Sequence, residues 1–339
     1  MNAPAPDISV CIANYNGEDD LSACLDAVRA QQGSFRCEVL LHDDASTDLS
    51  LALIRARYPD VQVLESSRNV GFCISNNRMV EAARGRYVLL LNNDAVLRPD
   101  SLQRLFTFAE GDHTDCILGL PQYTLLDGTL VDRGYRTDPF LNPIAILPEG
   151  THEAGVATGA CLWIPRAVWD AVGGFPPWFE SVAEDIFLCV AARLLGYRVL
   201  VLDEPGFDHW IGKNLGGGKL VAQRLSTTVR RRSLSERNKT AVMLMCYPWP
   251  ALLPLLPLHV LLLTAEALFL LAAGTGCDKV GAIYAPIPRW LWRHRKAILS
   301  WRRRLMQKRR TGAQAFFTQT SWLPHKLGML LRFGKPALR

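Results

Sequence analysis

The chain has 339 residues, a formal net charge of +6 and a hydrophobic fraction of 49%. This length accommodates one large α/β domain with an added segment. The nine cysteines are scattered, with no Cys-x-x-Cys pair and no Cys/His zinc spacing, which excludes a disulfide scaffold and argues for small buried side chains in a reducing compartment. Residues 1–7 lack the basic and apolar regions of a signal peptide, which predicts a catalytic part that stays in the cytoplasm.

The first hundred residues alternate short apolar runs with segments of helical periodicity. The apolar runs predict strands at 8–13, 37–42, 61–64 and 87–91, and the segments between them predict helices at 18–32, 49–58 and 75–83. Strands and helices that alternate at this interval are typical of right-handed βαβ units, which build a parallel sheet. We therefore expect an α/β fold in this part of the chain.

Polar clusters follow three of these predicted strands, at 14–17 (Asn-Tyr-Asn-Gly), 43–48 (Asp-Asp-Ala-Ser-Thr-Asp) and 92–94 (Asn-Asn-Asp). Loops at the carboxyl ends of parallel strands form the ligand site in open α/β sheets. No Gly-x-Gly-x-x-Gly or Gly-x-x-x-x-Gly-Lys-Ser/Thr motif follows any strand, which argues against a dinucleotide enzyme and a P-loop NTPase. A nucleotide bound here would be held by side chains and a metal ion.

Asp94 follows the apolar strand at 87–91, where a buried carboxylate is costly unless it is hydrogen-bonded or binds a cation. Mg²⁺ and Mn²⁺ prefer oxygen ligands and share phosphate oxygens, so one or two protein ligands and a diphosphate complete their coordination. The alternative is that Asn93 and Asp94 only cap the turn that leads into Arg98.

The region 101–155 is poorly patterned, and we interpret it as loops and short strands that border the site. Beyond it, strands are predicted at 159–164 and 197–202, and helices at 166–172 and 186–195. Glu184 and Asp185 begin the second helix, either as simple capping groups or as a general base. His209 is either an ordinary histidine or a ligand that completes a metal site.

The polar motifs occur in one order along the chain: 43–48, Asn69-Val70-Gly71-Phe72 with Asn76-Asn77, 91–94, Gly173-Gly174-Phe175, Glu184-Asp185 and His209. This ordered set resembles the family 2 glycosyltransferases, particularly their rhamnosyltransferase-like branch. The resemblance covers about residues 7–240. It implies the GT-A fold, a Rossmann-like α/β arrangement with a mostly parallel sheet flanked by helices.

The resemblance also implies roles for individual residues. Asp43 matches the carboxylate that accepts the pyrimidine N3–H, Asp94 the metal-binding carboxylate, and Asp185, next to Glu184, the catalytic base. His209 matches a diphosphate or metal contact. The remaining matches line the donor pocket, namely Ala13, Asn14, Tyr15, Asn69, Asn77, Asn92 and Asn93.

Four positions depart from the family pattern. Ala13 stands where proline or threonine is usual, and Asn93 where proline is common. Phe187 replaces a frequent acid, and Pro176 replaces the aspartate of Gly-Gly-Phe-Asp. The last two positions make acceptor specificity the property that is hardest to transfer.

The C-terminal part is apolar and then strongly basic. Residues 230–339 contain 20 Lys and Arg against 3 Asp and Glu, which predicts an anionic partner. The segment 251–273 is apolar except for His259 and Glu266, and Pro254 and Pro257 interrupt it. The following segment 285–310 interleaves cations with tryptophans and aliphatic residues at helical spacing, as in helices that lie in the headgroup region.

Nucleic acid is the rival partner for this basic segment, and the apolar neighbour favours a membrane. Glu266 at mid-bilayer would cost about 2.5 kcal/mol or more. A monotopic or re-entrant helix is therefore favoured over a true span, and packing of 251–273 onto the rest of the protein as core is the alternative.

We thus predict a catalytic domain at 1–240, with a nucleotide-binding half at about 7–100 and an acceptor half at about 101–240, and membrane-associating helices at 241–339. The expected activity is inverting, metal-dependent (Mg²⁺ or Mn²⁺) transfer of a sugar from a dTDP- or UDP-sugar, rhamnose among the candidates. The expected acceptor is a lipid-linked saccharide of cell-surface polysaccharide assembly, at the cytoplasmic face of the plasma membrane and without a nucleic-acid partner. The alternatives are a polyprenyl-phosphate sugar synthase and a catalytically inactive membrane- or nucleic-acid-binding scaffold.

Overall fold

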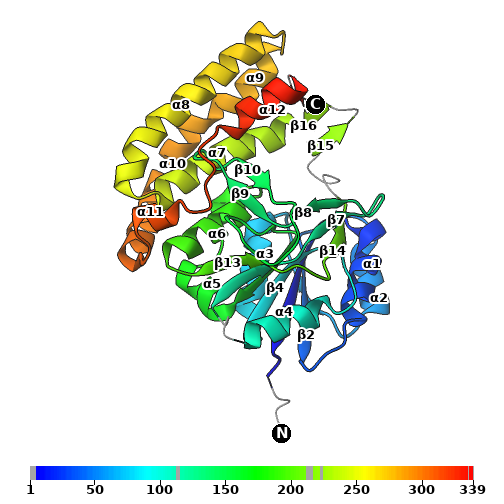
Figure 1. The fold of residues 1–339 in the computed structure, drawn as a ribbon. Coiled ribbons are helices and arrows are strands. Elements are labelled where there is room, and N and C mark those ends of the chain that lie inside the picture. Colours follow the sequence, from blue (N-terminus) through cyan, green and yellow to red (C-terminus); the bar gives the residue numbers. More distant parts are fainter. Residues whose placement is uncertain (1–4, 112–114, 211–216, 222–223, 335, 339) are drawn as a thin grey trace. The chain divides into compact units, whose positions relative to one another are not determined.

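Eight strands form the central sheet in this computed structural model, which describes residues 5–111, 115–210, 217–221, 224–334 and 336–338 (Figure 1). The chain divides into two units. The first unit comprises residues 1–135, 145–192 and 197–210, and the second comprises 136–144, 193–196 and 211–339. All residues predicted for the site belong to the first unit.

The strand order of the large sheet is β11-β13-β6-β12-β4-β1-β2-β3. Its strands are β1 (Ile8–Asn14), β2 (Cys37–Asp43), β3 (Gln62–Glu65), β4 (Tyr87–Asn92), β6 (Cys116–Gly119), β11 (His152–Glu153), β12 (Cys161–Pro165) and β13 (Arg198–Val201). The helices of this unit are α1 (Glu18–Arg29), α2 (Ser50–Arg57), α3 (Phe72–Ala82), α4 (Ser101–Glu110), α5 (Arg166–Val172) and α6 (Glu184–Leu194), with a 3₁₀ turn η1 (Pro177–Phe179).

The half of the sheet built by β1, β2, β3 and β4 is parallel, as the sequence predicts. Residues of β1 and β4 alternate between a core with α1, α2 and α4 and the opposite face, and both strands are almost fully buried. Burial on both faces explains why these strands are continuous apolar runs. Figure 1 shows helices on both sides of the sheet.

The other half of the sheet is mixed, because β12 runs antiparallel between β4 and β6. The predicted α/β architecture with a mostly parallel sheet is therefore confirmed, and the antiparallel strands β12 and β11 make the sheet mixed. The interpretation of 101–155 as loops and short strands is wrong for Ser101–Glu110, which form helix α4. That helix buries Leu102, Leu105 and Ala109 at helical spacing against the sheet.

A second, four-stranded sheet has the order β5-β14-β7-β8. Its strands are short, with bounds β5 (Ala95–Leu97), β7 (Gln122–Thr124), β8 (Leu130–Asp132) and β14 (Phe207–His209). Because β5 follows directly from Asp94, this sheet extends from the carboxyl end of β4. Residues far apart in the sequence are thereby brought to the predicted metal site.

The second unit is mainly helical (Figure 1). Its helices are α7 (Val229–Cys246), α8 (Trp249–Ala272), α9 (Cys277–Tyr284), α10 (Pro286–Lys308), α11 (Ala313–Phe316) and α12 (His325–Phe333). The remaining short strands are β9 (Tyr135–Thr137), β10 (Pro143–Ala145), β15 (Gly217–Val221), β16 (Arg224–Thr227) and β17 (Ala337–Leu338). The predicted domain boundary at residue 240 falls within α7.

Residues 251–272 of the apolar segment lie in one continuous helix, α8, so the predicted interruption by Pro254 and Pro257 is wrong. The basic segment 285–310 is also helical, and Ile298 and Leu305 of α10 are buried. Part of its predicted apolar stripe therefore serves the protein interior, since α10 packs on α7 and α9. The expectation of buried cysteines holds for seven of the nine, whereas Cys37 and Cys277 are exposed.

Candidate active site

The first polar cluster is a hydrogen-bonded chain across three adjacent strand ends. Strands β1 and β2 pair in a register that sets Asn14 opposite Asp43. The Asn14 amide donates to Asp43 Oδ1 at 3.0 Å, and Asn93 Nδ2 donates to Asn14 Oδ1 at 2.9 Å. Asp43 and Asn14 are almost fully buried. The structure thus brings together three of the residues predicted to bind the donor.

The loops after β1 and β2 are tied to each other over this chain. Asn16 Oδ1 accepts from the Thr47 backbone N–H at 2.8 Å, and Ser46 Oγ accepts from the Asn16 backbone N–H at 3.0 Å. Tyr15, which precedes Asn16 in the first loop, is 48% exposed, so its ring is available for stacking. Ala13 is half-buried at the end of β1. The two loops form one rigid rim next to Asp43.

Asp44 received no role in the sequence analysis, although it is almost fully buried. Its two carboxylate oxygens accept from the backbone N–H groups of Val70 and Gly71, at 2.7 and 2.8 Å. Asp44 thereby holds the loop that carries Asn69, whose side chain is exposed. Two consecutive acids at the end of β2 were the available signal, because a contact with the base needs only one of them.

Asp94 and His209 lie together through the pairing of β5 with β14, which sets Ala95 opposite His209. His209 Nε2 is 3.1 Å from Asp94 Oδ1, and the Trp210 backbone N–H donates to the Asp94 carbonyl at 3.4 Å. Asp94 is 5% exposed. The structure therefore joins the two side chains that the sequence assigns to a metal, although 115 residues separate them.

Two amides complete the surroundings of His209. Gln122 Nε2 lies 3.3 Å from His209 Nδ1, and Asn92 Nδ2 lies 3.4 Å from His209 Nε2. The buried Asn92 Oδ1 has no hydrogen-bond partner among the residues that the structure describes. An oxygen of this kind beside a carboxylate and an imidazole is a ready ligand for a hard cation.

These donors fit a divalent ion of the Mg²⁺ or Mn²⁺ type, with Asp94, His209 and the Asn92 carbonyl as candidate ligands. Within the described ranges, no group of three or more His, Cys, Asp or Glu side chains is arranged to hold a metal. Two or three protein ligands leave several coordination positions, which a diphosphate would have to fill. Gln122 beside the far nitrogen of the imidazole would help to orient the ring.

Asp185 and Glu184 begin helix α6 directly after a turn of unusual backbone conformation. Glu180, Val182 and Ala183 all have positive φ values, of 67°, 71° and 68°. Such conformations are costly for non-glycine residues and are held only where the surroundings impose them. They cluster at functional sites, so the turn supports a functional role for the helix start.

The two acids at this helix start differ in environment. Asp185 is half-buried, and its Oδ2 accepts from the Gly159 backbone N–H at 3.2 Å. Glu184 is 8% exposed. The partial exposure makes Asp185 the better candidate for a base that must reach an acceptor.

Asp132 is a buried carboxylate that the sequence analysis did not single out. It stands opposite Gln122 in the pairing of β7 with β8, and accepts from Tyr135 Oη at 2.6 Å and the Gly134 backbone N–H at 2.9 Å. Burial raises the pKa of Asp132 to about 6, although both hydrogen bonds lower it. The charges of His209 and Asp185 also act on this pKa, in opposite directions. Asp132 is thus part of the electrostatic surroundings of the site.

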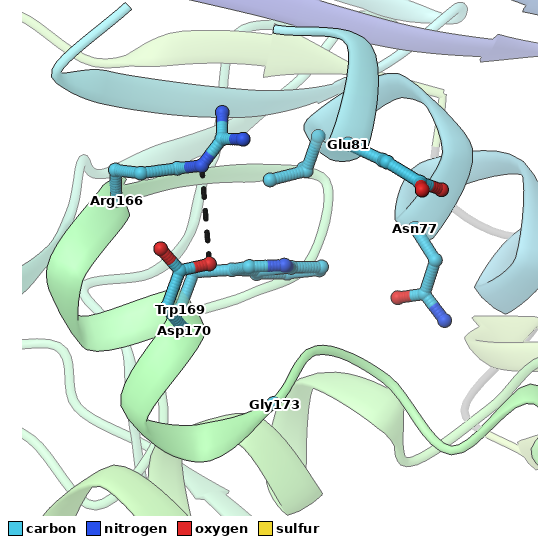
Figure 2. Close-up of a pocket in the computed structure, with 7 residues that line it drawn as sticks. Asn77, Glu81, Arg166, Trp169, Asp170 and Gly173 are labelled. Carbon is cyan, nitrogen blue, oxygen red and sulfur yellow. Dashed lines mark ion pairs between the residues drawn. The ribbon is translucent and has the colours of Figure 1, made fainter.

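Asn77 lies apart from these clusters, on a cavity of about 310 Å³ between α3 and α5 (Figure 2). Its amide donates to the Phe175 carbonyl and accepts from the Phe175 backbone N–H, each at 2.9 Å. Figure 2 shows the ring of Trp169 and the Arg166–Asp170 ion pair on the same cavity. Asn77 therefore anchors the turn at Phe175, and its predicted contact with the donor stays a prediction.

Part of the chain is similar to known proteins. Residues 9–173 match the glycosyl transferase family 2 domain. The succinoglycan biosynthesis protein ExoO of Rhizobium meliloti is 33% identical over 133 residues, which are 38% of each chain. The poly(ribitol-phosphate) beta-glucosyltransferase of Bacillus spizizenii is 32% identical over 117 residues, 33% of this chain and 18% of that protein. The chain thus spans well under half the length of these relatives.

Solved structures share the fold at low sequence identity. The S. aureus protein TarS (residues 1–349, with UDP) aligns with a TM-score of 0.55 and 15% identity, over 94% of this chain and 93% of that one. The mannosyltransferase PcManGT of Pyrobaculum calidifontis, with GDP-Man and Mn²⁺, aligns with a TM-score of 0.53 and 17% identity, over 90% and 86%. The mixed sheet flanked by helices is therefore the GT-A-like fold expected from the sequence, and residues 9–173, just under half of the chain, match the glycosyl transferase family 2 model.

Proposed function

We propose that this protein is an inverting, metal-dependent glycosyltransferase that moves a sugar from a nucleotide-sugar donor to a hydroxyl of a lipid-linked saccharide. The observation that carries the proposal is the buried pair of Asp94 and His209 next to the unpartnered Asn92 Oδ1, at the same sheet edge as Asn14 and Asp43. A nucleotide site and a cation site that share one edge suit a nucleoside diphosphate.

The nucleotide is assigned to the rim formed by the first two loops. Asp43 accepts the imide N–H of a pyrimidine, and the exposed ring of Tyr15 stacks on the base, with Ala13 and Asn14 alongside. Asn69, Asn77 and Asn93 are assigned to the donor pocket by resemblance. A dTDP- or UDP-sugar fits this chemistry, and rhamnose from dTDP-rhamnose is the specific donor that the resemblance suggests. Solved neighbours with UDP or GDP-Man support a nucleotide sugar in general.

Asp94, His209 and Asn92 would hold a Mg²⁺ or Mn²⁺ ion against the diphosphate. When bound, the ion neutralises the negative charge that develops on the leaving diphosphate. The solved neighbour PcManGT contains Mn²⁺, which supports this assignment. Gln122 keeps the His209 ring oriented. Asn93 is hydrogen-bonded to Asn14 and so links the turn at 92–94 to the rim assigned to the nucleotide.

Asp185 is the proposed base, with Glu184 beside it at the helix start. The acceptor hydroxyl oxygen attacks the anomeric carbon while the bond from that carbon to the diphosphate oxygen breaks. The diphosphate leaves with the electron pair, and the hydroxyl proton passes to the Asp185 carboxylate. Attack from the side opposite the leaving group inverts the anomeric centre. The Gly159 N–H holds one Asp185 oxygen, which leaves the carboxylate oriented.

The biological setting is proposed from the relatives and from the second unit. ExoO is a succinoglycan biosynthesis protein, which supports a role in polysaccharide assembly. Residues 230–339 are strongly basic, and α8 is the one helix in the described chain long and apolar enough to cross a membrane. An active site on the cytoplasmic face of the plasma membrane, at an anionic surface, suits a lipid-linked glycan acceptor. No nucleic-acid partner is proposed.

The substitution Asp185→Asn tests this mechanism. Sugar transfer should fall about 10²- to 10⁴-fold, because the amide cannot take the acceptor proton. The measurement is release of nucleoside diphosphate from a panel of UDP-, GDP- and dTDP-sugars with a lipid-linked saccharide extract. Asp60→Asn, an exposed carboxylate paired with Arg29, is the matched control and should retain full turnover.

Near-normal turnover of the Asp185→Asn variant would contradict the general base and favour a polyprenyl-phosphate sugar synthase. In that alternative the acceptor is already an anionic phosphate and needs no base. If the wild-type protein binds no nucleotide at all, the chain is the inactive scaffold instead.

A further inference from the structure

Helix α8 presents a wide apolar surface to its surroundings along its whole length. Exposed side chains occur from the second turn to the last turn, namely Leu253, Leu258, Val260, Leu261, Leu262, Leu268, Phe269 and Leu271. Only 11% of its most apolar 18-residue window is buried. At about 1.5 Å per residue, the 24-residue helix is long enough to cross the roughly 30 Å hydrocarbon core. Length alone therefore does not decide between a span and an in-plane helix.

The two titratable side chains of α8, His259 and Glu266, face other helices of its own unit. His259 is buried and lies 2.9 Å from Thr240 Oγ1 of α7. Glu266 is ion-paired with Arg232 of α7 and accepts from Lys326 of α12 at 2.9 Å. Leu252 and Leu270 continue the same inward stripe. The predicted cost of an unpaired Glu266 in lipid is thus removed, since its carboxylate is paired within the protein.

These contacts set α7 antiparallel to α8 over most of its length, because Thr240 meets His259 and Arg232 meets Glu266. Helix α7 carries a cluster of charges that its neighbours neutralise. Glu236 is almost fully buried and ion-paired with Lys239 at 3.2 Å and with Lys326 at 2.8 Å. Arg230, in the first turn of α7, is exposed. The helix that accompanies α8 is therefore unsuited to lipid contact.

The helices of the unit differ in the side chains that they expose. Helix α10, packed on α7 and α9, has eight Lys and Arg and no acid among its 23 residues, and it exposes Arg289, Arg293 and Arg303. Helix α12, joined to α8 by Lys326, exposes Leu327 and Leu331 at 54% and 81%. The exposed apolar side chains thus come from α8 and α12. The exposed cations of α10 are typical of helices that bind anionic lipids.

We infer that α8 lies in the plane of one leaflet of an anionic bilayer, with its outward stripe among the acyl chains, and does not cross the membrane. A crossing would carry α7 and α10 with it, since these helices pack on each other, and would bring the exposed Arg289, Arg293 and Arg303 of α10 to lipid, where each charge is strongly disfavoured. An in-plane helix buries the apolar stripe and leaves α7 and α10 in the aqueous and headgroup region. This inference rests on the membrane location proposed above and is independent of the sugar chemistry.

Sidedness of the residue after α8 tests the inference. Cys277 is exposed just beyond α8, so a membrane-impermeant maleimide can report its side. The Cys277 probe carries Cys37→Ser, which removes the other exposed cysteine. The reference is Ser34→Cys, an exposed position in the first unit, in a Cys277→Ser and Cys37→Ser background. In sealed vesicles of defined orientation, both probes should react from the same side. Reaction from opposite sides would establish a span and overturn the inference.

The outward stripe is tested separately with the purified full chain and vesicles containing 30% phosphatidylglycerol. Leu261→Glu with Leu268→Glu should weaken vesicle binding at least 10-fold, because both positions are exposed and leave the inward contacts intact. Leu126→Glu, equally exposed on the first unit, should bind as wild type. Nucleotide binding of each variant shows that it is folded.

The remaining outcomes are distinct. If the double variant binds vesicles normally but changes from dimer to monomer by light scattering, the stripe is an interface between copies and the inference is wrong. If wild-type protein ignores these vesicles, the membrane location itself fails, while the glycosyltransferase proposal is judged by its own turnover assay.

Discussion

At the scale of single residues, the hydrogen-bonded chain Asn93–Asn14–Asp43 links the turn at 92–94 to the loops assigned to the nucleotide. This chain depends on the absence of a side chain at Gly17. A Cβ at Gly17 would overlap Asn93 Nδ2 and Asn14 Oδ1. Gly17→Ala should therefore break the Asn93–Asn14 hydrogen bond and weaken nucleoside diphosphate binding about 10-fold. The measurement is calorimetric titration of the nucleotide.

Gly111→Ala is the control for this substitution, since a Cβ there meets only backbone oxygens at ordinary contact distances of 3.5 and 3.9 Å. Unchanged affinity of the Gly17→Ala variant would mean that the hydrogen-bonded chain contributes nothing to the nucleotide site.

The raised pKa of Asp132 predicts that the free energy of unfolding depends on pH. Its pKa is raised by burial to about 6, above the 3.8 of a free carboxyl, so the folded protein keeps this proton over a range where the unfolded chain has lost it. The free energy of unfolding should then fall as pH rises from about 4 to about 6, by on the order of 2–3 kcal/mol from this group.

Asp132→Asn should remove this contribution, so that the difference between wild-type and variant unfolding free energies changes across pH 4–6 and is flat above it. Urea unfolding at a series of pH values measures it. A difference that does not vary with pH would contradict the raised pKa.

At the scale of elements, the sequence was sufficient where strands are long and apolar. Strands β1, β2 and β4 and the helices between them agree with the predicted ranges to within a few residues. The motifs at their ends could be placed on one edge for the same reason, because parallel strands end together. Asn14, Asp43 and Asn93 are accordingly found within hydrogen-bonding distance of one another.

The elements that could not be predicted are short or depend on tertiary pairing. Strands β5, β7, β8 and β14 have three residues each, too few to display a period of two. Gln122 and Asp132 reach the site only through the pairing of these strands, so nothing local in the sequence identifies them. His209 was found through the resemblance, not through its own surroundings.

Proline positions misled the prediction for α8. Each proline removes one backbone hydrogen bond from a helix, and two of them suggest a break. Pro254 and Pro257 both lie on the exposed side of α8, so their rings stay clear of the stripe that packs on α7. The inward contacts of Leu252 and His259 support the helix on either side of them.

At the scale of the whole molecule, the second unit includes segments from outside the C-terminal region. It includes 136–144 and 193–196, and Lys239 Nζ donates to Asn142 Oδ1 at 2.6 Å while Tyr247 Oη donates to the Pro139 carbonyl at 3.0 Å. Deleting 251–339 would remove Lys326 from Glu236 and Glu266 from Arg232. Surface substitutions on α8 therefore test membrane binding more cleanly than truncation.

The central claim is that Asp94 and His209 hold a cation against a nucleoside diphosphate. Its most direct test is calorimetric titration of UDP, GDP and dTDP into the full-length protein with and without Mn²⁺. We predict that Mn²⁺ tightens binding of at least one of them 10-fold or more, that Asp94→Asn abolishes this gain, and that Asp208→Asn, a carboxylate of the same strand as His209 but paired with Arg98, keeps it. Equal affinity with and without Mn²⁺, or a full gain in the Asp94→Asn variant, would contradict the metal site.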